Sequence, residues 1–293
     1  MNIILRLAGR NIKVFLRDKI SVFFSFLSVF IIIGLYALFL GDINMQNIKA
    51  MINQDNGNIR FLVDSWIMSG ILVVNAITVT LGMFSVMIDD ETKKRMQGFL
   101  VTPISRMKLV IGYLIASWAV GFILCMVTLV AAEIYIIAGG GALLSLTAML
   151  KVIGLTALNV FSSSCIVFFL VSFVKSVGGF STLSTIVGTI IGFITGIYIP
   201  IGVLPSAVQS AIKFVPPAHG AVLMREVFTE KPLSLVFGGA PAEVASHFIE
   251  IFGIQIKVYD KVLSDITMIA IVALSGLLFL ALSIFRMSRR KIG

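Results

Sequence analysis

The sequence predicts an all-α integral membrane protein with six transmembrane helices. Hydrophobic residue types make up 58% of its 293 residues, whereas Asp, Glu, Lys and Arg together make up only 13%. A typical soluble domain carries about 25% charged residues, and at a mean hydropathy of +1.06 too few polar side chains are present to cover a globule of this size. This composition excludes an ordinary cytosolic enzyme, a disordered chain and a secreted disulfide scaffold. The apolar runs lack the alternation of a membrane β-barrel, so the spans are predicted to be helices.

The six predicted spans are uncharged apolar stretches of the length that a helix needs to cross a bilayer. About 20 residues are required to cross roughly 30 Å of hydrocarbon. The stretches that meet this length are residues 20–40, 65–88, 109–132, 152–174, 179–200 and 266–285. The N-terminal segment shows no small-residue cleavage site after a short apolar core, so we expect the first span to be retained rather than removed as a signal peptide.

Lys and Arg are divided unequally between the two sides that six spans create. With both termini on one side, that side holds 15 Lys and Arg residues and the other holds 8. Cytoplasmic loops of membrane proteins carry the excess of basic residues. We therefore predict that both termini are cytoplasmic. The net charge of +9 follows from this bias, and nucleic acid is not predicted as a partner.

Residues 3–19 are predicted to form an amphipathic helix in the membrane interface. The basic residues recur in one stripe at i, i+4, i+7 and i+11: Arg6, Arg10, Lys13 and Arg17. The predicted apolar face holds Leu5, Ala8, Ile12, Phe15 and Leu16. A helix with two such faces lies in the plane of the membrane. It serves either as a basic anchor before the first span or as a lever that contacts a cytoplasmic partner.

Residues 89–108 form the one sizeable internal loop. The loop is acidic at its start, then basic, then apolar, and a helix over about 91–101 is predicted to end before Pro103. Phe99 and Leu100 would be exposed on this helix unless the membrane-facing side of the bundle or a partner protein covers them. Both interpretations stay open at this point.

The external segments are predicted to be one polar loop and one mixed cap. Residues 41–64 are polar and predict a solvated loop with one or two helical turns. Residues 201–215 are apolar but interrupted by Pro205, a pattern that fits a short re-entrant helix whose backbone is satisfied by protein or water. The remainder of 201–265 is predicted to form a small extracytoplasmic cap.

Several polar and small residues lie inside the predicted spans. Asn75 and Asn159 need partners there, either from a neighbouring helix or from a water-filled path. The fifth span carries glycines at every fourth position with a threonine beside them: Gly188, Gly192, Gly196 and Thr189. Such a groove allows close backbone approach, either within one subunit or at a seam between subunits or along a path.

Catalytic and metal-binding patterns are missing from the sequence. It contains no Gly-x-x-x-x-Gly-Lys-Ser/Thr phosphate loop, no Gly-x-Ser-x-Gly and no His-Glu-x-x-His. The two histidines are isolated, and the two cysteines lie in apolar runs. We therefore predict no catalytic residue, no metal ligand and no cofactor bound by this chain. The spans also lack the carboxylate or histidine relay of a proton-driven antiporter.

The order of these elements resembles the membrane subunit of ABC-2 type transporters over essentially the whole chain, as a single transmembrane domain. The most specific local match is Val101-Thr102-Pro103-Ile104-Ser105-Arg106, which is similar to the loop that ends in Thr-Pro-Val/Ile-Ser-Arg ahead of the third span in that family. Leu204-Pro205 and Pro216-Pro217 match the prolines that follow the family's fifth span. The chain departs from the family at Arg95-Met96, where a Gly-Thr pair is common.

The resemblance implies which residues contact the partners. Helix 91–101 would be the coupling helix, and its contact with a cytoplasmic ABC ATPase subunit would involve Glu91, Arg95, Phe99, Leu100, Pro103 and Arg106. Helix 3–19 would be the connecting helix. Two permease subunits, identical or closely related, would pair, and ATP and Mg would bind to the ATPases. The path or dimer seam would be lined by Asn75, Asn159, Gly188, Thr189, Gly192 and Gly196.

The function implied is that of the permease of an ATP-driven exporter in a prokaryotic plasma membrane. Its largely apolar spans favour an amphipathic or hydrophobic substrate such as a drug, a peptide antibiotic or a lipid-like molecule, and membrane lipids surround it. Three alternatives remain: a secondary carrier, a membrane-embedded lipid-modifying enzyme, and a signalling or immunity subunit that binds a ligand through the 201–265 cap.

Overall fold

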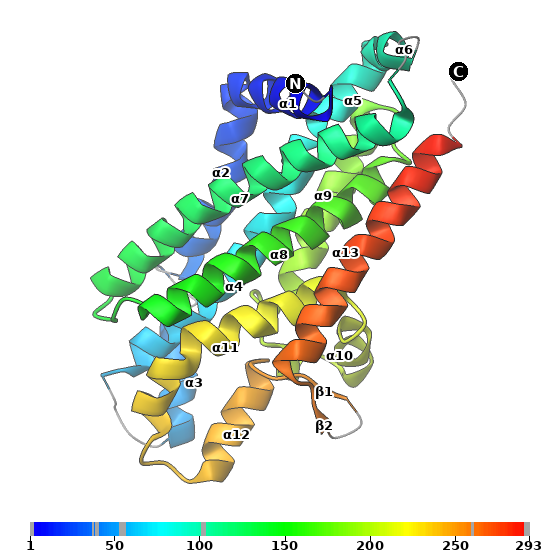
Figure 1. The fold of residues 1–293 in the computed structure, drawn as a ribbon. Helices are drawn as coiled ribbons and strands as arrows, with labels where there is room; N and C mark the ends of the chain where they lie inside the picture. The colour runs from blue at the N-terminus through cyan, green and yellow to red at the C-terminus, as the bar shows by residue number, and fades with distance from the viewer. Residues whose placement is uncertain are drawn as a thin grey trace.

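The computed structural model describes residues 3–36, 38, 41–52, 57–100, 104–258 and 261–289, and these residues form a helical bundle (Figure 1). Its helices are α1 (Ile3–Arg17), α2 (Lys19–Leu35), α3 (Gly41–Ile52), α4 (Ile59–Met83), α5 (Ser85–Thr92), α6 (Arg95–Leu100), α7 (Arg106–Ala138), α8 (Leu146–Val171), α9 (Val177–Ile194), the 3₁₀ helix η2 (Ile201–Val203), α10 (Ser206–Ile212), α11 (Pro216–Phe237), α12 (Ala242–Ile251) and α13 (Asp265–Ser288). Two short strands, β1 (Lys257–Val258) and β2 (Lys261–Val262), pair antiparallel. The predicted all-α class is confirmed.

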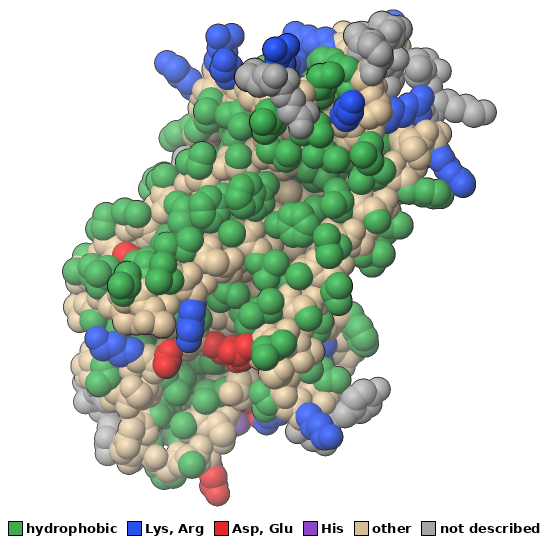
Figure 2. All heavy atoms as spheres, viewed as in Figure 1, with side chains coloured by type: hydrophobic (Ala, Val, Ile, Leu, Met, Phe, Trp, Pro, Cys, Tyr) green, Lys and Arg blue, Asp and Glu red, His purple; other side chains and the backbone are tan. Residues whose placement is uncertain are grey.

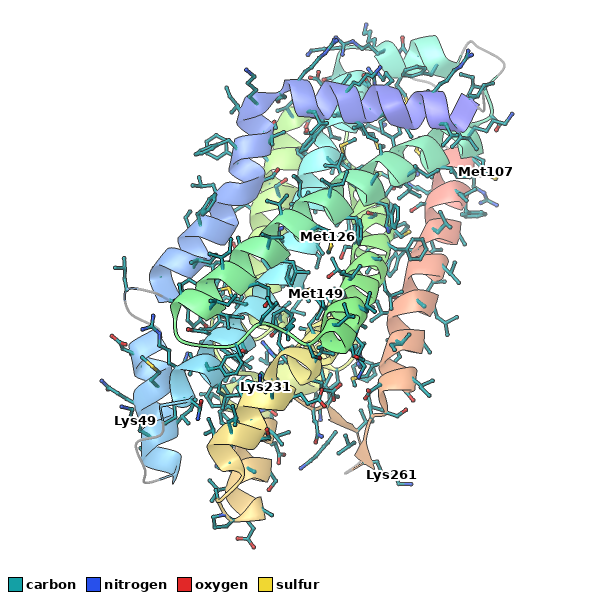
Figure 3. The ribbon with its side chains drawn as sticks, turned by 60° about the vertical axis from the view of Figure 1, so that its left-hand side comes forward. Lys49, Met107, Met126, Met149, Lys231 and Lys261 are labelled. Carbon is teal, nitrogen blue, oxygen red and sulfur yellow. The ribbon has the colours of Figure 1, made fainter. Side chains whose placement is uncertain are left out.

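Five segments of the described chain are each long and apolar enough to cross a membrane: α4 with α5, then α7, α8, α9 and α13. A sixth span is obtained when α1 and α2, which meet at an angle of 85°, are counted together. Helix α1 therefore lies across one end of the bundle, while α2 runs along it. Figure 3 shows this arrangement, with Met107 at the α1 end and Lys49, Lys231 and Lys261 toward the other end.

Serine side chains fix where four of the long helices begin. The hydroxyl oxygen accepts a hydrogen bond from the backbone N–H three residues further on, which satisfies one of the N–H groups that a helix start leaves unpaired. The four pairs are Ser105 with Lys108, Ser145 with Ala148, Ser176 with Gly179, and Ser264 with Thr267. The starts of α7, α8, α9 and α13 are thus set by local sequence.

Helix α4 forms the centre of the bundle. Its apolar residues surround the whole helix rather than one stripe, and 22 of its 25 residues are buried. It packs against α2, α7, α8 and α11. Trp66 on α4 donates a hydrogen bond from its indole Nε1 to the backbone oxygen of Phe252 at 2.7 Å, which ties α4 to the segment after α12.

Helices α9 and α13 lie at the edge of the bundle. Only Ile191 and Gly192 of α9 are buried, and α13 buries one narrow stripe. The outward faces carry large exposed apolar side chains, including Ile186 and Ile190 on α9 and Leu274 on α13. In a membrane protein, such faces contact lipid or another membrane helix.

The predicted end of the fifth helix was wrong. Helix α9 ends at Ile194 and not at residue 200, so Gly196 lies in the turn beyond the helix. Gly196 has φ +68°, a left-handed conformation that glycine adopts without strain. The N–H groups of Ile197 and Tyr198 both bond back to the carbonyl of Gly192, at 2.9 and 3.3 Å, and this closes the helix.

The end of the bundle opposite α1 is more helical than the sequence predicted. Within the described part of the 41–64 loop, α3 runs for 12 residues and α4 begins at Ile59. The predicted re-entrant stretch forms η2 and α10, and the cap is built from α11, α12 and the two short strands (Figure 1).

We predict that Gly121→Ala lowers the thermal stability of the purified protein. A Cβ at Gly121 on α7 would lie 2.8 Å from Val160 Cγ1 on α8 and 3.1 Å from Thr80 Cγ2 on α4, and both neighbours are stiff β-branched side chains. Overpacking at such a point costs about 1–3 kcal/mol, and a lowered melting midpoint in detergent would report it.

The matched control is Gly154→Ala on α8, where nothing lies within 4 Å of the added Cβ. This change should leave the midpoint unchanged or raise it, because alanine favours a helix by up to about 1 kcal/mol over glycine. Equal midpoints for the two variants would contradict the close contact of α4, α7 and α8 at Gly121.

Candidate functional site

A buried carboxylate joins three elements at the α1 end of the bundle. Asp90, near the end of α5, is fully buried. Both terminal guanidinium nitrogens of Arg10 on α1 donate to it, Nη2 to Oδ1 at 2.6 Å and Nη1 to Oδ2. The hydroxyl of Tyr113 on α7 donates to Oδ2 at 2.6 Å. A buried charge is costly unless it is paired and hydrogen-bonded, and Asp90 has both an opposite charge and several donors.

The approach of α1 to α7 depends on a glycine and on small contacts along α1. A Cβ placed at Gly112 of α7 would lie only 2.8 Å from the Cβ of Leu7 on α1, so a glycine is needed for this close approach. Phe15 and Asn11 are buried on the same side of α1, and Asn11 Oδ1 accepts a hydrogen bond from Arg10 Nη1 at 3.0 Å. These contacts orient Arg10 toward Asp90.

Helix α6 is a separate short helix that is attached to this carboxylate. Lys94 has φ +57°, a left-handed conformation that interrupts the helix between α5 and α6. Arg95 is the first residue of α6. Its Nη1 lies 3.7 Å from Asp90 Oδ1 and 3.8 Å from Asp89 Oδ2. Phe99 lies under the guanidinium of Arg10, with 5.6 Å between the Arg10 Cζ and the ring centroid. Helices α6 and α1 therefore meet directly.

This geometry corrects the predicted helix over 91–101. Glu91 belongs to α5, and α6 covers only Arg95–Leu100, because the left-handed Lys94 interrupts the helix. Met96, which follows Arg95, is buried and anchors α6. Pro103 and the side chain of Leu100 lie outside the described residues.

Arg106 lies at the end of α13. Its Nη1 donates to the backbone oxygens of Met287 and Ser288 at 3.3 and 3.0 Å. A guanidinium at this position satisfies carbonyl groups that the last turn of a helix leaves unpaired and complements the helix dipole. Arg106 therefore connects the start of α7 to the end of α13.

The amphipathic pattern of α1 is partly different from the prediction. Arg6, Lys13 and Arg17 are exposed, as the stripe indicates, but Arg10 turns inward to Asp90. Leu5 and Leu16 are 57% and 52% exposed and do not belong to the packed face, which is formed by Leu7, Ala8, Asn11 and Phe15. Contact with α7 sets this face, and single-sequence periodicity does not identify the neighbour. Figure 2 shows basic side chains gathered over this end.

The two intramembrane asparagines are held in separate helix contacts. Asn75 on α4 is fully buried and donates from Nδ2 to Thr128 Oγ1 on α7 at 2.7 Å. Asn159 on α8 is buried against Gly220 of α11, where a Cβ would clash with its amide. These partners lie on α7 and α11, so the structure does not gather the two asparagines with the α9 residues.

The glycines of α9 do not form one continuous open groove. No atom lies within 4 Å of a Cβ placed at Gly188, whereas the ring of Tyr198 fills the space at Gly192. Gly196 faces Ile201 and Arg225 from the turn after the helix. Thr189 is exposed, and its hydroxyl donates to the backbone oxygen of Thr185 at 2.8 Å. Of the predicted seam, Gly188 and Thr189 are open at the surface.

A fully buried arginine was missed by the sequence analysis. Arg225 on α11 is 0% exposed, and it donates to the backbone oxygens of Gly253, at 3.2 Å, and Thr195. Its Cζ lies 4.8 Å from the ring centroid of Trp66. Burial lowers the pKa of Arg225 to about 10, so it stays cationic near neutral pH. Its position near the end of α9 connects the turn, α4 and α11.

Asp90 was also missed, although a weak signal exists. It is the second of two acidic residues, after Asp89, that follow an apolar run, in a position where a carboxylate tends to need a partner. Tyr113 and Arg225 carry no such signal. Among the described residues, no group of three or more His, Cys, Asp or Glu side chains is placed to hold a metal ion.

The fold and this site define a multi-pass helical membrane protein with short helices joined at one end. The chain belongs to the ABC-2 transporter family, because the family model described as "ABC-2 family transporter protein" matches residues 43–285. It is thus a membrane transport component, the permease of an ABC transporter, and permeases of this family generally work with an ATPase subunit. The search of curated proteins found no match.

We predict that Asp90→Asn weakens the attachment of α1 and α6. The change removes the charge that Arg10 binds, and hydrogen bonds to charged groups contribute about 1.5–3 kcal/mol. The melting midpoint should fall, and trypsin should cut more readily after the basic residues of α1. Asp42→Asn is the control, because Asp42 is an exposed carboxylate in the first turn of α3, away from α1, α5 and α6. A midpoint and a cleavage pattern shared by both variants and the wild type would contradict this assignment.

Proposed function

We propose that this chain is the permease subunit of an ATP-driven exporter, and that α6 is its coupling helix. A cytoplasmic ABC ATPase would contact α6 and bind ATP and Mg, while this chain binds neither. The substrate would be amphipathic or hydrophobic, such as a drug, a peptide antibiotic or a lipid-like molecule. The membrane would be a prokaryotic plasma membrane, and a role in resistance to such compounds fits this substrate class.

The observation that carries this proposal is the meeting of α6, α1 and α5 at Asp90. A force on α6 reaches Asp90 through Arg95 and reaches α1 through Phe99 and Arg10. Helix α5 continues almost directly from α4, with only Phe84 between them. Movement at α6 would therefore pass to the central helix of the bundle, and through Tyr113 to α7.

The orientation and the interfacial position of α1 belong to the same proposal. The end that holds α1 and α6 carries the exposed Arg6, Lys13 and Arg17, which favours the cytoplasm. Leu5 and Leu16, exposed on another side of α1, suit contact with the lipid interface. Helix α1 would then have one face toward α7, one toward lipid and one toward the cytoplasm.

A second permease subunit would pack against α9. This helix is long enough to span the membrane but buries only two residues in its own chain, and Gly188 leaves space beside it. Small residues at an exposed position let a second helix approach closely. The partner would be a second copy of this chain or a close paralogue, and the path would lie near this seam.

The mass of the intact complex, purified from native cells in mild detergent, tests this proposal. Two copies of this chain with two copies of an ATPase are expected, or one copy each of two related permeases with two ATPases. A chain that purifies without an ATPase under every detergent tested would sink the proposal and favour a secondary carrier or a lipid-modifying enzyme.

We predict that Phe99→Asp abolishes recovery of the ATPase with the purified chain. Phe99 is half-buried on α6, and a carboxylate in its place would be desolvated at the contact. Leu143→Asp is the control, because it places the same carboxylate on an apolar residue that is 56% exposed, in the loop between α7 and α8. Normal ATPase recovery with Phe99→Asp, at an unchanged melting midpoint, would overturn the placement of the coupling helix.

A further inference from the structure

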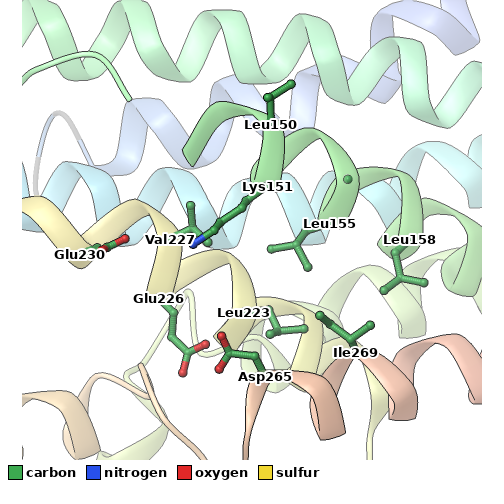
Figure 4. Close-up of a pocket in the computed structure, with 11 residues that line it drawn as sticks. Leu150, Lys151, Leu155, Leu158, Leu223, Glu226, Val227, Glu230, Asp265 and Ile269 are labelled. Carbon is green, nitrogen blue, oxygen red and sulfur yellow. The ribbon is translucent and has the colours of Figure 1, made fainter. Parts of the chain in front are cut away.

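A cavity of about 630 Å³ lies between α8, α11 and α13, away from the α1 end and from the exposed face of α9. Its size is in the range of small-molecule sites. Three helices supply apolar walls, with Leu155 and Leu158 from α8, Leu223 from α11 and Ile269 from α13 (Figure 4). Gly154 widens it, since nothing lies within 4 Å of a Cβ placed there.

Charged side chains line one side of this apolar cavity. Glu226 and Glu230 come from α11, Asp265 is the first residue of α13, and Lys151 comes from α8 (Figure 4). Among the described residues, none of the three carboxylates forms an ion pair, and Lys151 has no carboxylate within 4.0 Å. One lysine against three carboxylates leaves the lining negative, in a chain whose net charge is +9.

Glu226 and Asp265 are the central pair of this lining. Glu226 is half-buried, and burial together with the neighbouring charge of Asp265 raises its pKa to about 7. Asp265 lies in the first turn of α13, where the helix dipole favours a negative charge. Two like charges beside apolar walls repel one another, and a cation between them would relieve this repulsion.

We propose that this cavity binds a small amphipathic cation, with its charge between Glu226 and Asp265 and its apolar body against Leu155, Leu158, Leu223 and Ile269. Charge selects a cation over an anion of the same shape, and the apolar walls select it over a metal ion or a hydrophilic amine. We commit to a free small molecule as the occupant, and competition with a lipid distinguishes it from a lipid headgroup. Binding of the cation can be measured on this chain without an ATPase, so a negative result would leave the proposed exporter role untouched.

Binding of tetraphenylphosphonium to the detergent-purified chain tests the proposal, with tetraphenylborate as an anion of matched size and shape. We expect saturable binding of one cation per chain, and no competition by the anion. Glu226→Gln and Asp265→Asn should each weaken binding at pH 8 at least tenfold at an unchanged melting midpoint. Glu243→Gln, an exposed carboxylate on α12 outside the cavity, should bind as the wild type does. Equal affinity in all variants, or equal competition by the anion, would overturn the proposal.

The pH dependence gives a second readout that a structural role would not produce. A carboxyl with a pKa of about 7 goes from about one-tenth ionised at pH 6 to about nine-tenths at pH 8, so affinity should rise up to about ninefold over this range. Glu226→Gln should lose this rise, while Lys151, Glu230 and Asp265 still face the site. Displacement of the probe by added phosphatidylethanolamine at stoichiometric amounts would instead assign the cavity to a lipid headgroup.

Discussion

Every polar group that leaves water in this chain needs a partner, and those partners decide where its helices meet. Asp90 draws α1 and α7 to the end of α5, and Asn75 holds α4 against α7 through Thr128. Arg225 satisfies carbonyl groups at the end of α9 and after α12. Apolar packing between membrane helices is weakly specific, because lipid is as apolar as a leucine side chain. The few polar pairs therefore add specificity to contacts that glycines and close apolar packing also shape.

The spans could be predicted because the signal is local. A run of about 20 uncharged apolar residues has few alternatives to a membrane helix, and composition alone excluded the soluble classes. The ends of helices that depend on distant contacts could not be predicted in the same way. Helix α9 ends where Tyr198 folds back over Gly192, and the break before α6 depends on a left-handed Lys94. Neither residue type requires such a conformation.

The sequence predicted which helices form the candidate site, but it did not predict which side chains of these helices contact one another. Sequence periodicity placed Arg10 on a basic stripe of a helix, but its partner lies 80 residues away, and no pattern in one sequence joins the two. Arg106 was predicted at the contact with the ATPase, and its hydrogen bonds within the chain, to the carbonyl groups of Met287 and Ser288, were not predicted. Arg225 looked like one of several basic residues in an external segment, although it is fully buried. In each case the missing information was the identity of a neighbouring helix.

The position of Arg10 and Asp90 along the chain has a consequence for how this ion pair forms during synthesis. The chain is made from its N-terminus, so Arg10 is already present when Asp90 emerges, and Tyr113 follows only 23 residues later. Asp90 can thus move from water to its buried position with a cation waiting, and the carboxylate need not pass through an unpaired state. If this end packs in the order in which its helices are made, α1 is in place first, α5 then brings the anion, and α7 completes the hydrogen bonds of Asp90.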